Sequence, residues 1–285
     1  MISLGLDIGG SSVKAALTDA GKTLATAQSQ PYRRPTLDEL ASALRSAAST
    51  TGALARPFQT TGLCAPGLVD ADGVTVRTSV NIPDLQGVRL TEFISRALSV
   101  SASPPRVFTD AHAAAHDLWS RDKPRGRFLA ISIGTGVGAC VLDDGRPLHV
   151  SATSPGHLGQ IDVSLDEHAP IGPDGGRGSL EAYIGLPALE RRYGSSLEQA
   201  LGAMSPADPP LRALARAIRI THAIYRPQTI ALLGGVGIRL RPILPVLESL
   251  IDDALSSLAR PDRALVTGDS QFHAAVGAAN LAAHA

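Results

Sequence analysis

Apolar and polar positions alternate along residues 2–28 as they do in short strands separated by glycine turns. The letters ISLGLDI predict a buried strand, GGSS a turn, VKAALTDA a second strand and GKTLATAQSQ a third. Residues 126–148, GRFLAISIGTGVGACVLDDGRPL, repeat this order of strand, glycine turn, strand, turn and strand. The repetition predicts a duplicated α/β domain with a cleft between the two halves.

Helical spacing of apolar residues follows each of these segments. Leu37, Leu40 and Leu44 share one helical face, behind Thr36 as the predicted N-cap and with Glu39 placed for a capping box. Further along, a strand at 107–108 runs into an alanine-rich helix, and helices dominate residues 180–224. One more strand precedes the glycine pair of TIALLGGVG, and FHAAVGAANLAAHA predicts a terminal helix.

Composition narrows the class of protein. The chain has 285 residues and 44% hydrophobic content, enough for two domains with real cores. Basic and acidic residues both number 26, a balance that favours neither nucleic acid nor an anionic membrane as partner. Cys64 and Cys140 lie in apolar segments, which indicates buried thiols in a reducing compartment. Without a leader-like start or 18 continuous apolar residues, we expect a soluble cytoplasmic protein that acts on small molecules.

Two glycine turns are candidates for phosphate binding. Asp7 ends the first predicted strand, and its turn contains Gly9, Gly10, Ser11 and Ser12. Backbone N–H groups of such a turn can bind phosphate oxygens and Asp7 can hold Mg²⁺ through water, although an ordinary β-hairpin explains the same letters.

The corresponding turn of the second half supports the phosphate interpretation. It follows the strand at 129–133 and contains Gly134, Thr135 and Gly136. Neither turn matches a P-loop, and neither opens a helix as a dinucleotide-binding turn does.

Asp110 lies where a short strand continues into a helix. Local sequence permits two roles: an N-terminal cap, or a general base that takes the proton of a hydroxyl attacking a γ-phosphate. His112 and His116 follow with the spacing of metal ligands, but no third ligand is near in sequence. We interpret both histidines as surface or packing residues.

In this order, LDIGGSSVKAAL, SIGTGVGA and LLGGV resemble the phosphate-1, phosphate-2 and adenosine motifs of the ROK family of sugar kinases. The resemblance extends over essentially the whole chain and includes APGLVDADG, NIP and AAVGAANLA. It implies the two-domain α/β fold of actin, hexokinase and Hsp70, a duplicated ribonuclease H-like fold with an interdomain cleft. The smaller domain would comprise residues 1–109 and 272–285, and the larger one residues 110–271.

The resemblance also implies an activity and a set of site residues. Asp110 would be the general base in transfer of a phosphoryl group from ATP, with Mg²⁺, to a hexose hydroxyl. Thr109 stands where the family usually has Asn, and Gly234 and Gly235 would let the backbone approach the adenine nucleotide. The implied sugar contacts are Asn81, Thr109, His157 and Glu181. A homodimer is implied by the family alone.

The zinc-binding motifs of the family are altered in this chain. GHLGQIDV has His157 at a glutamate position of the first motif, and GPDGGRGSLE keeps a later glutamate as Glu181. The four zinc-ligand positions carry Gln160, Gly172, Asp174 and Ser179, which do not offer the thiolate and imidazole donors of a tetrahedral site. We therefore predict no structural zinc and a sugar preference that differs from glucose, unless His157 only packs in its loop.

Two other functions stay open at this stage. One is a non-catalytic sugar-binding regulator; family repressors carry an added N-terminal helix-turn-helix, whereas the first phosphate motif begins here at residue 4. Retention of Asp7 and Asp110 favours an enzyme. The other is a polyphosphate-dependent glucokinase, since GGSSVKAAL resembles those enzymes too. The sugar and the phosphorylated hydroxyl are not defined by the sequence.

Overall fold

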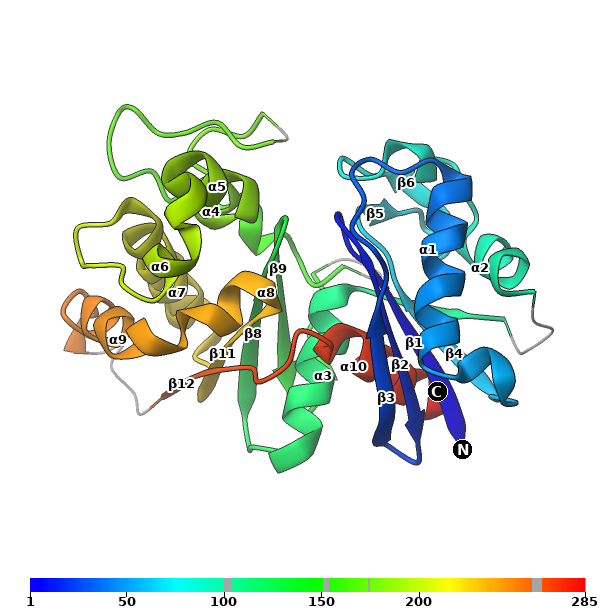
Figure 1. Ribbon diagram of the computed structural model, residues 1–285. Helices are drawn as coiled ribbons and strands as arrows, with labels where there is room; N and C mark the ends of the chain where they lie inside the picture. The colour runs from blue at the N-terminus through cyan, green and yellow to red at the C-terminus, as the bar shows by residue number, and fades with distance from the viewer. Residues whose placement is uncertain (100–103, 151–153, 174, 258–262, 285) are drawn as a thin grey trace. The chain divides into compact units, whose positions relative to one another are not determined.

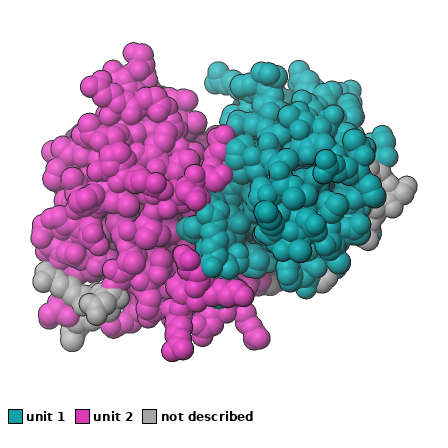
Figure 2. Space-filling view, turned by 60° about the horizontal axis from the view of Figure 1, so that its bottom comes forward, with its two compact units in different colours: residues 1–121, 272–285 teal, residues 122–271 magenta. Residues whose placement is uncertain are grey.

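The computed structural model describes residues 1–99, 104–150, 154–173, 175–257 and 263–284 (Figure 1). Backbone contacts divide the chain into unit 1, residues 1–121 and 272–285, and unit 2, residues 122–271 (Figure 2). From the sequence we placed the first boundary before Asp110, whereas the contacts group the helix that follows, up to Arg121, with unit 1. The return to unit 1 at residue 272 is the same in both divisions.

Unit 1 contains a five-stranded sheet of order β3-β2-β1-β4-β7. Its first three strands form an antiparallel meander, and β4 and β7 add in parallel to β1. The carboxyl ends of β1, β4 and β7 therefore share one edge, at which Asp7, Cys64 and Phe108 are register neighbours. The strands are β1 (Ile2–Ile8), β2 (Val13–Asp19), β3 (Lys22–Gln28), β4 (Thr60–Cys64) and β7 (Arg106–Phe108).

Successive side chains of β1 point to opposite faces of the sheet. Both faces therefore carry apolar side chains, and helices cover both. Leu4, Leu6 and Ile8 join one core with the apolar faces of α1 and α2. The capping box predicted at Thr36 and Glu39 is confirmed at the start of α1. The helices of unit 1 are α1 (Leu37–Thr50), α2 (Leu90–Leu98), α3 (Asp110–Asp122) and α10 (His273–His284), beside the short strands β5 (Leu68–Val69) and β6 (Val76–Thr78).

The terminal helix α10, red in Figure 1, lies directly on the other face of the sheet, at positions where only glycine fits. A Cβ on Gly5 of β1 would overlap the Ala275 carbonyl oxygen, and a Cβ on Gly62 of β4 would also overlap α10. Helix α10 approaches α3 equally closely, since a Cβ on Gly277 of α10 would overlap the Ala113 carbonyl oxygen of α3. These close approaches hold β1 and α3 against one helix.

Unit 2 repeats the strand order of unit 1. Its sheet has the order β10-β9-β8-β11-β12, again an antiparallel meander followed by parallel strands. The duplicated fold predicted from the repeated strand and turn pattern is thereby confirmed. The strands are β8 (Arg127–Ile133), β9 (Val137–Asp143), β10 (Arg146–Pro147), β11 (Thr229–Leu233) and β12 (Ala264–Thr267).

The helical region expected at 180–224 is divided into separate helices that, together with α9, enclose the apolar core of unit 2. They are α4 (Leu180–Ile184), α5 (Leu186–Tyr193), α6 (Leu197–Leu201) and α7 (Pro209–Tyr225), followed by α8 (Gly234–Gly237) and α9 (Leu244–Asp252). Cys64 and Cys140 are buried free thiols, as predicted. Among the residues described, no helix is both long and apolar enough to cross a membrane.

Candidate active site

The first glycine turn joins β1 to β2 and has Asp7 at its base. Asp7 is 8% exposed, and the Nζ atom of Lys14, its register neighbour on β2, lies 3.6 Å from its Oδ2 atom. The turn is closed by a hydrogen bond of 3.0 Å from the Gly9 N–H to the Ser12 carbonyl. Within the described part of the chain the N–H groups of Gly10 and Ser11 have no partner. Two adjacent N–H groups without partners are suited to an anion.

Tyr32, which we did not single out from the sequence, holds the carbonyl side of this turn. Its Oη atom donates to the Gly9 carbonyl at 2.7 Å, and its N–H donates to the Ser11 carbonyl at 2.8 Å. Burial and then the negative charge of Asp7 raise the pKa of Tyr32, so the phenol stays protonated and can donate. Because these contacts occupy carbonyl oxygens, the N–H side of the turn stays open.

Asp110 is the first residue of α3, at the same edge of the sheet as Asp7. Its Oδ1 atom accepts a hydrogen bond of 2.8 Å from the Ala111 N–H. The cap of the helix is the preceding residue: Thr109 Oγ1 accepts from the His112 N–H at 3.2 Å, and the Thr109 carbonyl accepts from the Ala113 N–H. Capping, one of the two roles considered for Asp110, is thus performed by Thr109.

Electrostatics couple Asp110 to Asp7. Burial and then the charge of Asp7 raise the pKa of Asp110, while the Ala111 N–H and the charge of Lys14 lower it. Asp110 keeps an exposed surface, so water screens part of these effects. At the same edge, burial, then Asp7, then Asp110 raise the pKa of the Cys64 thiol. One sheet edge thus presents two carboxylates, a lysine and an open turn.

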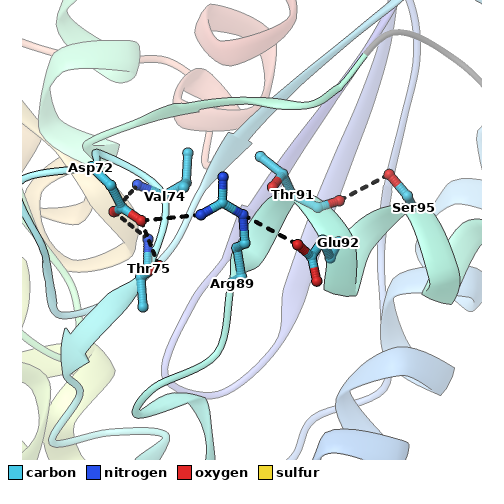
Figure 3. A network of polar contacts seen from close by, with 7 residues as sticks. All are labelled: Asp72, Val74, Thr75, Arg89, Thr91, Glu92 and Ser95. Atoms are coloured by element: carbon cyan, nitrogen blue, oxygen red, sulfur yellow. Dashed lines mark hydrogen bonds and ion pairs between the residues drawn. The ribbon is translucent and has the colours of Figure 1, made fainter.

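Asn81, the proposed sugar contact of the NIP segment, is half-buried in the stretch that follows β6. A polar network nearby joins the turn before β6 to the start of α2 (Figure 3). Arg89 contacts Asp72 at 3.3 Å and Glu92 at 3.2 Å, and Asp72 accepts hydrogen bonds from the side chain and N–H of Thr75. The hydrogen bonds from Thr75 are the main cause that lowers the pKa of Asp72 to about 2, so the network persists at neutral pH.

In unit 2, the second glycine turn lies between β8 and β9 and contacts Glu181. The Gly134 N–H donates to the Gly136 carbonyl at 2.9 Å, beside the half-buried Thr135. Glu181 Oε2 accepts from the Val137 N–H at 2.8 Å, and a Cβ on Gly136 would lie 2.8 Å from the same oxygen. We expected Glu181 to contact sugar and the turn to bind phosphate; the structure places the carboxylate against the turn.

The glycine pair after β11 lies beside this turn. β11 runs parallel to β8, so their carboxyl ends share an edge. Gly234 has a φ of +77°, and a Cβ there would overlap the Ile133 carbonyl at the end of β8. A Cβ on Gly235 would meet no atom within 4 Å, so this backbone is accessible to a ligand. These are the residues for which the family resemblance implies a contact with the adenine nucleotide.

The first altered zinc motif lies next to β9. His157 and Gln160 are both exposed; His157 precedes the short 3₁₀ helix Leu158–Gln160, and Gln160 is its last residue. That helix packs closely on the sheet, because a Cβ on Gly159 would overlap the Val137 carbonyl. His157 is therefore held by its backbone while its ring is accessible, which leaves its predicted sugar contact as a proposal.

The second altered motif is organised by backbone hydrogen bonds. The Gly172 N–H donates to the Gly176 carbonyl at 2.8 Å, and Ser179 caps α4 by accepting from the Ala182 N–H at 3.2 Å. Asp174 lies outside the described residues. Where the structure describes the chain, it contains no group of three or more His, Cys, Asp and Glu side chains placed to hold a metal. The absence of zinc stays a prediction.

The histidines that follow Asp110 pack as expected. His112 stacks edge-on with Phe108 at a centroid distance of 6.1 Å. His116 is half-buried, and its burial lowers its pKa and favours the neutral form.

These features define a protein of the two-domain class that includes hexokinases, with equivalent sheets and a glycine turn at the end of each leading strand. Residues 3–285 match the model of the ROK family, and the chain belongs to that family. A ROK glucokinase structure from Streptomyces griseus, in complex with glucose and AMPPNP, has a TM-score of 0.78 at 22% identity over 100% of both chains.

Several similar proteins are sugar kinases with different substrates. The glucokinase of Thermotoga maritima is 27% identical over 69% of this chain and 70% of its own. The kanosamine kinase of Amycolatopsis mediterranei is 26% identical over 98% of this chain and 96% of its own. An inorganic polyphosphate/ATP-glucomannokinase from Arthrobacter has a TM-score of 0.70 at 22% identity, over 99% of this chain and 98% of its own. The family is therefore established, and the particular sugar is not.

Proposed function

We propose that this protein is a sugar kinase that transfers the γ-phosphoryl group of ATP to a hydroxyl of a hexose, with Asp110 as general base. The observation that carries the proposal is the edge of the unit 1 sheet that carries both Asp110 and Asp7, beside a turn with unused N–H groups. Phosphoryl transfer depends mainly on positioning and on stabilising charge, and this edge supplies a base and an anion site together.

Asp110 would take the proton of the attacking hydroxyl. A raised pKa makes its carboxylate a stronger base than an ordinary surface aspartate, and its exposed face lets substrate approach. The hydrogen bond from the Ala111 N–H fixes one carboxylate oxygen, so the other is the one available to the hydroxyl. Capping by Thr109 keeps this arrangement at the start of α3.

Phosphate and metal would be held mainly by the two glycine turns and Asp7. A single carboxylate next to an anion site fits Mg²⁺, which keeps several waters and is shared with substrate phosphates. When bound, Mg²⁺ would offset charge on the phosphates and reduce the repulsion between Asp7 and Asp110. The proposed donor contacts are Gly9, Gly10, Ser11, Ser12, Gly134, Thr135, Gly136, Gly234 and Gly235.

The proposed sugar contacts differ in the groups that they offer. Thr109 Oγ1 already accepts from the His112 N–H, so its hydroxyl can best donate to a sugar oxygen. Glu181, whose Oε2 accepts from the Val137 N–H, would contact a sugar hydroxyl through its carboxylate. His157 and Asn81 would complete the set. Replacement of a carboxylate by His157 supports a hexose other than glucose.

A panel of hexoses, amino sugars and N-acetylated amino sugars, assayed with Mg²⁺ and either ATP or inorganic polyphosphate, tests the proposal. Sugar phosphate identified by mass spectrometry, together with ADP release in the ATP arm, would establish the kinase and its donor. Sugar binding by calorimetry without transfer from either donor would instead support a sugar-binding regulator. Light scattering of the same sample would test the expected homodimer.

A further inference from the structure

Two arginines beside the first glycine turn, Arg33 and Arg34, have no part in the roles described so far. We propose that the Arg33–Arg34 pair binds the condensed phosphate chain of the phosphoryl donor and so helps to determine which donor is used. The inference rests on the proposed kinase function and adds a donor contact from the segment between β3 and α1.

Topology places this pair next to the turn. Because β1 and β3 are both antiparallel to β2, they run in the same direction and end at the same edge of the sheet. The side chain of Gln28, the last residue of β3, donates to the Ser12 hydroxyl at 2.8 Å. Tyr32 then bonds to the carbonyls of Gly9 and Ser11, so Arg33 directly follows a residue in contact with the turn.

The local backbone holds the pair in place from both sides. Tyr32 is bound to the turn on one side, and buried Pro35 with the capping box of Thr36 fixes the start of α1 on the other. Arg34 has a φ of +47°, a conformation uncommon for residues other than glycine. The pair is therefore carried by a defined bend of the chain.

The positive charges of Arg33 and Arg34 are available to bind an anionic ligand. Arg33 and Arg34 are both exposed, and neither side chain forms a hydrogen bond or ion pair with the part of the chain that the structure describes. Their acidic neighbour Glu39 is bound to the N–H and hydroxyl of Thr36. Guanidinium groups match phosphate oxygens with paired hydrogen bonds, so two of them beside open N–H groups favour a chain of phosphates over a single one.

This chemistry is shared by nucleoside triphosphates and inorganic polyphosphate. The proposal predicts that the pair contributes to donor affinity and leaves sugar affinity unchanged, since it is near the turn and not part of the proposed sugar contacts. A polyphosphate chain offers more phosphates than ATP, so its affinity should depend more strongly on the pair.

Substitution of both arginines by glutamine, Arg33→Gln with Arg34→Gln, removes the charges and keeps the stems. The chain offers a matched control in Arg56→Gln with Arg106→Gln. Arg56 precedes β4 and Arg106 begins β7, so both exposed arginines lie at the opposite edge of the sheet. The control removes the same charge from the same unit.

Binding of ATP and of inorganic tripolyphosphate is measured by calorimetry at low and high salt, beside KM for donor and sugar. We expect the Arg33/Arg34 variant to weaken donor binding about three- to tenfold at low salt, with the control close to wild type. High salt should reduce the difference, because exposed charges are screened. Unchanged affinity for both donors, or an equal loss in the control, overturns the proposal.

The two arms separate the sources of the phosphate chain. A loss with ATP alone assigns the pair to the nucleotide, and a loss with tripolyphosphate alone assigns it to inorganic polyphosphate. Since calorimetry requires no turnover, a protein that binds either donor through the pair but phosphorylates no sugar supports the inference while refuting the proposed function. A wild-type protein that binds neither donor refutes both.

Discussion

Replacing Asp110 by Asn should remove most phosphoryl transfer while leaving the protein at least as stable as the wild type. The amide keeps the shape of the side chain, and its oxygen can still accept the hydrogen bond of the Ala111 N–H. It cannot take a proton from the sugar hydroxyl. Loss of a general base typically lowers kcat by about 10² to 10⁴, and sugar affinity should change much less because other contacts hold the sugar.

The stability part of this prediction follows from the sign of the pKa shift. Burial and then the charge of Asp7 raise the pKa of Asp110 in the folded protein. Stability from this group is therefore fully present below the unfolded-state pKa of about 4 and is lost as pH rises through the higher folded-state pKa. Asn does not titrate, so the variant should gain stability relative to wild type across that window. The gain should be small, because Asp110 is exposed.

Thr109→Ala is the variant to compare with Asp110→Asn, because it changes the cap of α3 and keeps Asp110 in place. It removes the acceptor of the His112 N–H and should lower the free energy of unfolding by about 0.5–2 kcal/mol. The base would stay in place, so kcat should fall far less than in the Asp110 variant. Since Thr109 is also a proposed sugar contact, KM for sugar is expected to rise.

Urea unfolding at pH 4 and pH 7, kcat at saturating sugar and ATP, and sugar binding by calorimetry measure these effects on the same samples. An Asp110→Asn variant with near-normal kcat would remove Asp110 from the mechanism and, with it, most of the case for the kinase. A variant that loses stability at pH 7 by as much as Thr109→Ala would show that Asp110 supports the helix after all.

Three further predictions concern other parts of the chain. Elemental analysis should find no stoichiometric zinc, and activity should survive a chelator that spares Mg²⁺; about one zinc per chain would mean that residues such as His157 and His168 had formed a new site. His157→Glu should shift relative kcat/KM between glucose and other hexoses by about 1.5–3 kcal/mol, and an unchanged ratio would place His157 away from the sugar. Asp117→Ala should lower the free energy of unfolding, measured in urea titrations, by about 3–5 kcal/mol. It removes the carboxylate that lies 2.6 Å from the ring of buried His273 and also pairs with Arg121. Unchanged stability would contradict this.

The features that could be predicted from sequence are those that depend on local chemistry. Alternating apolar residues predicted the leading strands, since the pleat alternates side chains between faces. The capping box at Thr36 and Glu39 was predictable because its partners lie three residues apart. The two glycine turns were predictable from their place after apolar strands, and that repetition also indicated the duplicated fold.

The features that were missed arise from contacts between distant segments. Tyr32 reaches the first turn only because β1 and β3 end together. Glu181 meets Val137 across 44 positions of sequence, so its contact with the second turn has no local signal. The sequence offered Asp110 as a possible cap of α3, but the cap is Thr109, one residue earlier. Which of the two caps the helix depends on where the preceding strand ends.

The relation between Asp7 and Asp110 is also long-range, and it depends on the end of the chain. Asp7 is carried by β1 and Asp110 by α3, and α10 packs against both, through Gly5 on one side and its own Gly277 on the other. The Asp117–His273 contact joins α3 to α10 a second time. Because carbonyl oxygens occupy the space of any added Cβ at these glycines, neither element can take a larger side chain at the crossing without shifting. A small shift there would change the separation of the two carboxylates and hence the pKa of Asp110, so the basicity of the proposed catalytic residue depends on a helix formed by the last residues of the sequence.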